Sequence, residues 1–430
     1  MLPDEAAAKL APVNLQVGQT WMHQEHPQFD GSHTQDNPRV RSTYGMINDI
    51  RDPLIISDQL LVLRGTHRDT GDGVFTLTSW SGHPEVEGGD NLDISADWVG
   101  VTRDVLEAKL GGTALHIPES LGGMQSALFL ALPKVDENGV HHHELCAAED
   151  IANPEDVGCY GSQAGAPRLD SNGHPVPLLS PAETREVAVS HGWLIAEAAE
   201  RAIQAGEPIE TMTLDIDTEP LFIPVDNPTY QIIMSLNVLD IAQDEFITDP
   251  QLCPEMDEGL LLGCLASRVF RVRLGPIEFL TAPAEVTPEL AWGLPDDDAW
   301  LDEASAMAAR GPSSTYFPQH PDNCETVSFA DCSTKKTIGE CDCLSLHASP
   351  FILSDDPSQR PLLELSQAKY KAMVSMTDAY FSYALPEPDI HYSASLLENY
   401  LGDHFEDAIT MSYVMSTKIW QAHDTLNARW

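Results

Sequence analysis

The sequence is most informative at residues 74–97, which read VFTLTSWSGHPEVEGGDNLDISAD. An apolar run typical of a buried strand stops at His83 and continues as a loop rich in carboxylates. Residues 96–110 then carry apolar side chains at helical spacing, two glycines end that pattern, and a short apolar run returns at 114–117. This order predicts a strand, helix and strand unit of the α/β class.

The same criteria extend the α/β prediction over the rest of the chain. Strands are also expected at 14–22, 58–64, 210–216, 221–224, 268–274 and 277–281, and helices at 181–205 and near 404–420. Two segments with many turn signals, 131–183 and 301–360, are too long for ordinary connections. We therefore expect one domain over residues 1–430, in which a central mixed sheet is flanked by helices and carries two cysteine-bearing loop excursions.

The eight cysteines lie in local groups, which favours disulfides. The groups are Cys146 with Cys159, Cys253 with Cys264, and Cys324, Cys332, Cys341 and Cys343. The first two groups are the pairs we expect to be bonded, and such pairing indicates an oxidising compartment. A zinc–thiolate site is the alternative, and it is weaker because no CxxC pair is present.

Charge and composition exclude several classes of protein. The chain has 67 acidic and 23 basic residues and a formal net charge of -44, which disfavours binding to nucleic acid and to anionic membranes. Its 42% apolar residues are enough for a large core, and no stretch of about 18 apolar residues predicts a transmembrane segment. The first residues do not have the pattern of a secretory signal, although the expected disulfides indicate an exported protein. We therefore interpret the chain as N-terminally incomplete.

Five segments, in order, resemble the neutral ceramidase family of secreted or membrane-associated zinc amidases. They are residues 48–65, 80–100, 114–127, 221–231 and 273–295, and SYALPEPDIHY at 382–392 is a weaker sixth match. The resemblance implies zinc-dependent hydrolysis of an N-acyl amide such as ceramide, and therefore a role in sphingolipid metabolism. It also implies an extracellular or periplasmic location.

The resemblance assigns roles to three residues that are far apart in the sequence. His83 and Glu285 match zinc ligands, and Tyr383 matches a tyrosine that completes the zinc shell or hydrogen-bonds the reaction intermediate. His83 and Tyr383 are thus the expected catalytic residues. Each residue also has a purely structural interpretation: a histidine that hydrogen-bonds at a strand end, a solvated glutamate, and a tyrosine packed at a turn.

Substrate contacts are expected from two further segments. Gly122 and Gly123 are candidate backbone donors near a developing oxyanion, and Ser126 lies one position after the family's substrate-binding serine. His391 and Tyr392 are expected to line the pocket by the same resemblance.

The chain also departs from the family pattern. The family's first zinc histidine has no counterpart, although His23, His26 and His33 in a nearby loop are candidate replacements. Calcium is a second candidate cation at Asp296–Asp298, but this run lacks the alternating spacing of a calcium loop and is better interpreted as a solvated helix start. The run His141–His143 is interpreted as a solvated turn with adventitious metal affinity. Two hypotheses follow: a zinc-dependent amidohydrolase, or a catalytically inactive secreted protein that keeps the fold as a binding or structural module.

Overall fold

The structure is a computed structural model of the 430-residue chain. It describes residues 10–22, 48–49, 51–52, 57, 59–87, 91–122, 124–125, 132–141, 159–160, 181–225, 230, 246–254, 263–292, 346–347, 361–385, 412 and 414–429. For the short strands at 48–49, 51–52, 124–125, 132–133, 159–160 and 346–347, and for the first turn of the helix at 181, only the backbone is described.

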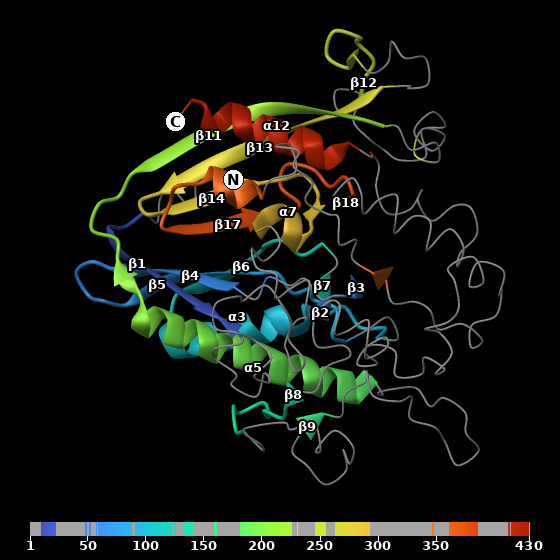
Figure 1. The fold of residues 1–430 in the computed structure, drawn as a ribbon. Coiled ribbons are helices and arrows are strands. Elements are labelled where there is room, and N and C mark those ends of the chain that lie inside the picture. The colour runs from blue at the N-terminus through green and yellow to red at the C-terminus, as the bar shows by residue number, and fades with distance from the viewer. Residues whose placement is uncertain are drawn as a thin grey trace, which may run out of the picture.

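Two five-stranded sheets face each other, and helices cover their outer faces (Figure 1). The first sheet has the order β10-β1-β4-β5-β6, with strands β1 (Val13–Trp21), β4 (Gln59–His67), β5 (Gly73–Trp80), β6 (Thr113–Pro118) and β10 (Glu207–Pro208). Helices α3 (Asp97–Leu110) and α5 (Pro181–Ala205) cover its outer face. Strands β5 and β6 are parallel and α3 connects them, which is the expected strand, helix and strand unit.

The second sheet has the order β11-β13-β14-β17, with β12 beside β13. Its strands are β11 (Leu214–Pro224), β12 (Phe246–Ile247), β13 (Cys264–Leu274), β14 (Ile277–Thr281) and β17 (Tyr370–Val374). Helix α12 (Met415–Asn427) covers the outer face of this sheet (Figure 1). Strands β14 and β17 are parallel, so both sheets contain one parallel pair.

Short elements complete the described architecture. They are helix α7 (Pro288–Trp292), the 3₁₀ helix η5 (Leu362–Leu365) and four two-stranded ladders: β2 (Asn48–Asp49) with β7 (Met124–Gln125), β3 (Arg51–Asp52) with β16 (Leu346–His347), β8 (Leu132–Pro133) with β9 (Cys159–Tyr160), and β15 (Glu285–Val286) with β18 (Tyr383–Ala384).

Alternating side chains of the strands build three apolar layers. On β4, Leu60 and Val62 belong to the core beneath α3 and α5, whereas Leu61 and Leu63 pack in the layer between the two sheets. Helix α5 lies so close to β1 that a Cβ atom on Gly18 would come within 2.1 Å of the carbonyl oxygen of Ala202. Only glycine fits at this position of β1. The result is a four-layer arrangement of helices, sheet, sheet and helix.

The structure confirms the mixed α/β class and corrects two details of the prediction. The strands divide between two sheets rather than forming one central sheet. The strands expected at 210–216 and 221–224 overlap a single strand, β11, which begins at Leu214 and continues through Pro220. A proline is tolerated there because, among the described strands, β11 lies at the edge of the sheet and pairs with β13 alone.

The helices agree with the prediction to different degrees. Helix α5 has the expected bounds, whereas the described part of the C-terminal helix ends at Asn427, seven residues beyond the expected 420. None of the helices in the described ranges is both long and apolar enough to cross a bilayer. The cysteine-rich segment 301–360 lies outside the described residues except for the two residues of β16.

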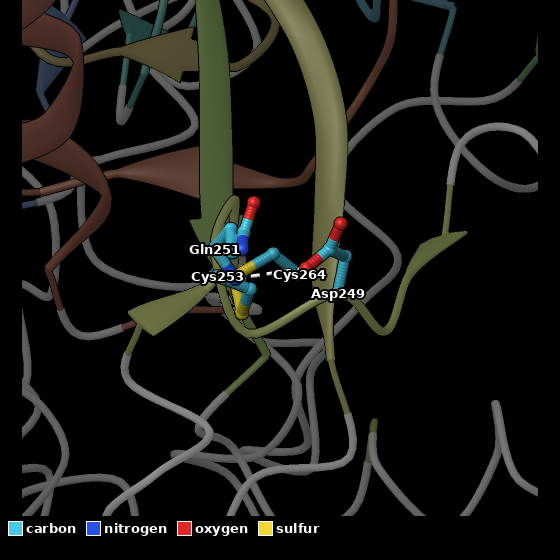
Figure 2. The surroundings of a disulfide bond; sticks show 4 residues. All are labelled: Asp249, Gln251, Cys253 and Cys264. Atoms are coloured by element: carbon cyan, nitrogen blue, oxygen red, sulfur yellow. Dashed lines mark hydrogen bonds between the residues drawn. A yellow bond between two sulfur atoms is a disulfide. The ribbon is translucent and has the colours of Figure 1, made fainter.

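A disulfide joins Cys253 to Cys264, as expected, and both cysteines are fully buried (Figure 2). It ties the turn that begins at Asp249 to the first residue of β13, and the backbone N–H groups of Gln251 and Cys253 both donate to Asp249. The second expected bond, from Cys146 to Cys159, involves side chains outside the described residues.

Removing this disulfide is expected to lower the free energy of unfolding. With a sequence separation of 11 residues, the loop-closure entropy corresponds to about 3 kcal/mol. We expect the Cys253→Ser/Cys264→Ser double variant to lose about 2–3 kcal/mol in denaturant unfolding under oxidising conditions. An unchanged unfolding midpoint in the double variant would contradict a structural role for the bond.

Candidate functional site

The candidate site lies at the edge where strands of both sheets end. His83 lies three residues after the end of β5 at Trp80, and Glu285 lies four residues after the end of β14 at Thr281. Tyr383 comes after β17, the parallel neighbour of β14. Parallel strands bring their carboxyl ends to one edge of a sheet, which is where ligand sites of α/β proteins commonly form.

Glu285 and Tyr383 are neighbours across a parallel ladder of two strands. Glu285 pairs with Tyr383 and Val286 pairs with Ala384 in the β15–β18 register. Because side chains alternate along a strand, Val286 and Ala384 enter the apolar core beneath α12 while Glu285 and Tyr383 face the opposite side. The backbone N–H of Glu285 donates to the carbonyl oxygen of Ser382 at 2.9 Å, which fixes this register.

His83 and Glu285 are in direct contact, although they lie 202 residues apart in the sequence. The distance from His83 Nε2 to Glu285 Oε2 is 3.0 Å, and the two side chains are 22% and 8% exposed. The carbonyl oxygen of His83 accepts a hydrogen bond from Trp98 Nε1 at 2.9 Å. The indole thus holds the end of β5 against α3 and fixes the position from which the imidazole reaches Glu285.

Two tyrosines surround the Glu285 carboxylate. Tyr380 donates its hydroxyl hydrogen to Glu285 Oε1 at 2.9 Å. Burial raises the pKa of Tyr383 to about 12, and the charge of Glu285 and a hydrogen bond to it act in the same direction. Burial and the same carboxylate raise the pKa of Tyr380 still further. Both phenols are therefore protonated at neutral pH, and both are donors.

The loop after His83 is organised around a second carboxylate, that of Glu87, which is 7% exposed. Its oxygens accept hydrogen bonds from Asn91 Nδ2, Ser95 Oγ and Arg185, each at 2.7 Å. The backbone N–H of Glu87 donates to Asp97 Oδ2 at 2.7 Å, and Asp97 is the first residue of α3. These hydrogen bonds attach Glu87 to α5 through Arg185 and to the start of α3 through Asp97, the residue before Trp98.

A third carboxylate, Glu119, is fully buried behind the site. It accepts hydrogen bonds from Ser57 Oγ at 3.2 Å, Gln59 Nε2 at 3.2 Å and Ser81 Oγ at 3.0 Å. Ser81 lies two residues before His83, and Gln59 also donates to the carbonyl oxygen of Lys371 in the other sheet. Glu119 therefore holds both Ser81, near His83, and Gln59, which bonds to the other sheet.

Gly122 lies beside Glu285, but its backbone donor is already used. Its N–H donates to the carbonyl oxygen of Val286 at 3.0 Å, so this group does not supply the oxyanion donor expected from the sequence. A Cβ atom on Gly122 would come within 2.8 Å of the carbonyl oxygen of Glu285. The absence of a side chain thus allows the segment after β6 to approach the strand that carries Glu285.

The remaining predicted residues lie outside the described part of the chain, at least in their side chains. These are Gly123, Ser126, His391 and Tyr392 for substrate, His23, His26 and His33 as replacement ligands, and Asp296–Asp298 for calcium. Their roles stay predictions.

His83 and Glu285 fit a zinc site in type of donor but do not complete one. Imidazole nitrogen and carboxylate oxygen are ordinary zinc ligands, and two ligands of a tetrahedral ion are about 3.3 Å apart, close to the observed contact. Among the described residues, however, no group of three or more His, Cys, Asp and Glu side chains is arranged to hold a metal ion. Any further ligand beyond the tyrosines would have to come from outside those residues.

Sequence reasoning missed Tyr380 and Glu119. Glu119 comes directly after β6, just as His83 comes shortly after β5, so a search for polar residues at strand ends would have found it. Tyr380 is three residues before Tyr383, but its contact depends on the loop between β17 and β18 and leaves no local pattern.

Two ceramidase structures are among the solved structures that are similar to this chain. One is described as neutral ceramidase from Pseudomonas aeruginosa and the other as a ceramidase complexed with C2; each has a TM-score of 0.44 and 12% sequence identity to this chain. Each match covers 99% of this chain, which spans about half of the other protein, 54% and 55%. No family model and no curated protein sequence matches.

Proposed function

We propose that this chain is a zinc-dependent hydrolase of N-acyl amides, with ceramide-like lipids as the substrate class. The observation that carries the proposal is the contact between His83 and Glu285 at 3.0 Å, beside two tyrosines and at the carboxyl ends of strands. The sequence segments that resemble neutral ceramidases support the choice of an amide bond and of a lipid as substrate.

The described residues have distinct roles in this proposal. His83 and Glu285 hold the ion, with Tyr383 beside them. A zinc ion bound there supplies an activated water at neutral pH and polarises the amide carbonyl. The hydroxyl of Tyr383, which lies beside Glu285, can donate a hydrogen bond to the oxygen that becomes negative as the carbonyl is attacked.

A second candidate function is a non-catalytic binding or structural module. It is favoured by one observation, that the described ranges contain no cluster of three ordinary metal-ligating side chains. In this case the His83–Glu285 pair is a hydrogen bond that joins the two sheets and binds no ion.

We also propose an extracellular or periplasmic location. The bond between Cys253 and Cys264 supports it, because disulfides persist mainly in oxidising compartments. The formal net charge of -44 favours a neutral or zwitterionic lipid over an anionic one as partner.

Hydrolysis of a defined lipid amide tests the proposed function. We expect the zinc-loaded chain to release fatty acid from a fluorescent short-chain ceramide in mixed micelles, and His83→Ala to lower kcat/KM by at least about 100-fold. His141→Ala is the matched control, because His141 contacts Glu197 at the same distance, 3.0 Å, on the surface of α5. Equal rates for the wild type and His83→Ala, or no hydrolysis by the zinc-loaded wild type, would contradict the proposal.

A further inference from the structure

The loop that carries Tyr380 has an unusual backbone. The described residues include four non-glycine residues with positive φ, and three of them lie in this loop: Met376 at 56°, Asp378 at 72° and Ser382 at 67°. Such conformations are costly for residues with side chains, and they persist where the surrounding structure imposes them. The fourth, Asp97 at 50°, begins the helix that holds His83 through Trp98.

Backbone hydrogen bonds attach this loop to the segment that leads into Glu285. The N–H groups of Met376, Thr377 and Phe381 donate to the carbonyl oxygens of Ala284, Ala282 and Pro283 at 3.1, 2.9 and 2.7 Å. On the outer side, Asp378 accepts a hydrogen bond from Ser267 Oγ at 3.0 Å. The Tyr380 loop and the Glu285 strand therefore form one unit, and the tyrosine is held at a fixed place relative to the carboxylate.

The two oxygens of Glu285 have different partners. Oε1 accepts the hydrogen bond from Tyr380 and Oε2 faces His83 Nε2, while Tyr383 also hydrogen-bonds the carboxylate. Without the Tyr380 hydroxyl, Oε1 would lose this donor and the carboxylate would have more freedom to rotate. Tyr380 itself is 52% exposed, so its hydroxyl contributes little to the core of the protein.

We propose that Tyr380 is a positioning residue that holds Glu285 Oε1 so that Oε2 is presented to the ion bound by His83. This inference rests on the proposed function and adds a residue to that site. Carboxylates that bind metals are themselves commonly hydrogen-bonded, and loss of such a partner typically lowers metal affinity by about 10–100-fold.

A zinc-affinity measurement on the full chain tests this role. Zinc would be titrated against a chromogenic chelator for the wild type, Tyr380→Phe and the control Tyr370→Phe. Tyr370 also hydrogen-bonds a carboxylate, that of Glu207, but it lies at the start of β17, at the other end of the β14–β17 pair. Thermal unfolding of the metal-free proteins would be recorded in parallel.

We expect Tyr380→Phe to bind zinc about 10–100-fold more weakly, with an unchanged thermal midpoint in the metal-free state, while Tyr370→Phe keeps the wild-type affinity. Wild-type affinity in Tyr380→Phe would overturn the positioning role alone. An equal loss in both variants would also overturn it, since the effect would then not depend on Glu285. A wild-type chain that binds no zinc would overturn the proposed function and this inference together.

Discussion

The Glu285→Ala variant is expected to bind zinc at least about 100-fold more weakly than the wild type, because it removes one of the two side chains, His83 and Glu285, that are proposed to hold the ion. The truncation also leaves the hydroxyl of Tyr380 without its acceptor. Equilibrium dialysis or chelator competition measures the affinity. Because the protein side chains must hold the ion while a water or substrate occupies another position, hydrolysis is expected to fall with zinc occupancy.

The surface of α5 offers a matched control for this variant. Glu197 contacts His141 Nε2 through both carboxylate oxygens, at 3.1 and 3.0 Å, so it forms a His–Glu pair like that of His83 and Glu285. Glu197→Ala is expected to leave the high-affinity zinc site intact. A larger loss of zinc in Glu197→Ala than in Glu285→Ala would show that the run His141–His143 binds the ion.

The second large effect is expected for stability, at Glu278. This carboxylate is fully buried between two arginines of β13, accepting hydrogen bonds from Arg271 Nε at 2.8 Å and Arg273 Nε at 2.9 Å. Arg271 is itself only 2% exposed. Glu278→Ala leaves this guanidinium buried without the facing carboxylate, so we expect a loss of about 3–5 kcal/mol in the free energy of unfolding.

Denaturant unfolding measures this loss, with Glu200→Ala as the control. Glu200 pairs with Lys109 at 2.8 Å, but the two side chains are 21% and 35% exposed, so its loss is expected to cost at most about 1 kcal/mol. Similar values for the two variants would contradict the interpretation of Glu278 as a buried charge that depends on its partners.

The elements that the sequence predicted best are those set by local patterns. Helix α5 matches its expected bounds, and the unit β5, α3 and β6 was found from apolar spacing and the glycines after α3. The division of strands between two sheets was missed because pairing depends on contacts far apart in the chain. Two separate strands were expected at 210–216 and 221–224, whereas β11 runs through both of these segments, because the sequence does not show that β11 lies at an edge where Pro220 is tolerated.

The candidate site was predictable only in part for the same reason. The resemblance to a family selected His83, Glu285 and Tyr383, and the structure brings them together, but their roles in metal binding and catalysis stay predictions. Tyr380 reaches Glu285 because of a loop conformation that has no sequence signature. The side chains that donate hydrogen bonds to Glu119 come from separate segments of the chain. Gly122 lies close to Glu285, but its N–H donates to the carbonyl oxygen of Val286, which the sequence did not indicate.

The central claim is that His83 and Glu285 bind one zinc ion together. Anomalous diffraction at the zinc absorption edge from crystals of the zinc-loaded chain tests it most directly. The claim predicts one strong peak within about 2.0–2.2 Å of both His83 Nε2 and Glu285 Oε2. A map with no peak between these two atoms, or with its only peak beside His141, would contradict it.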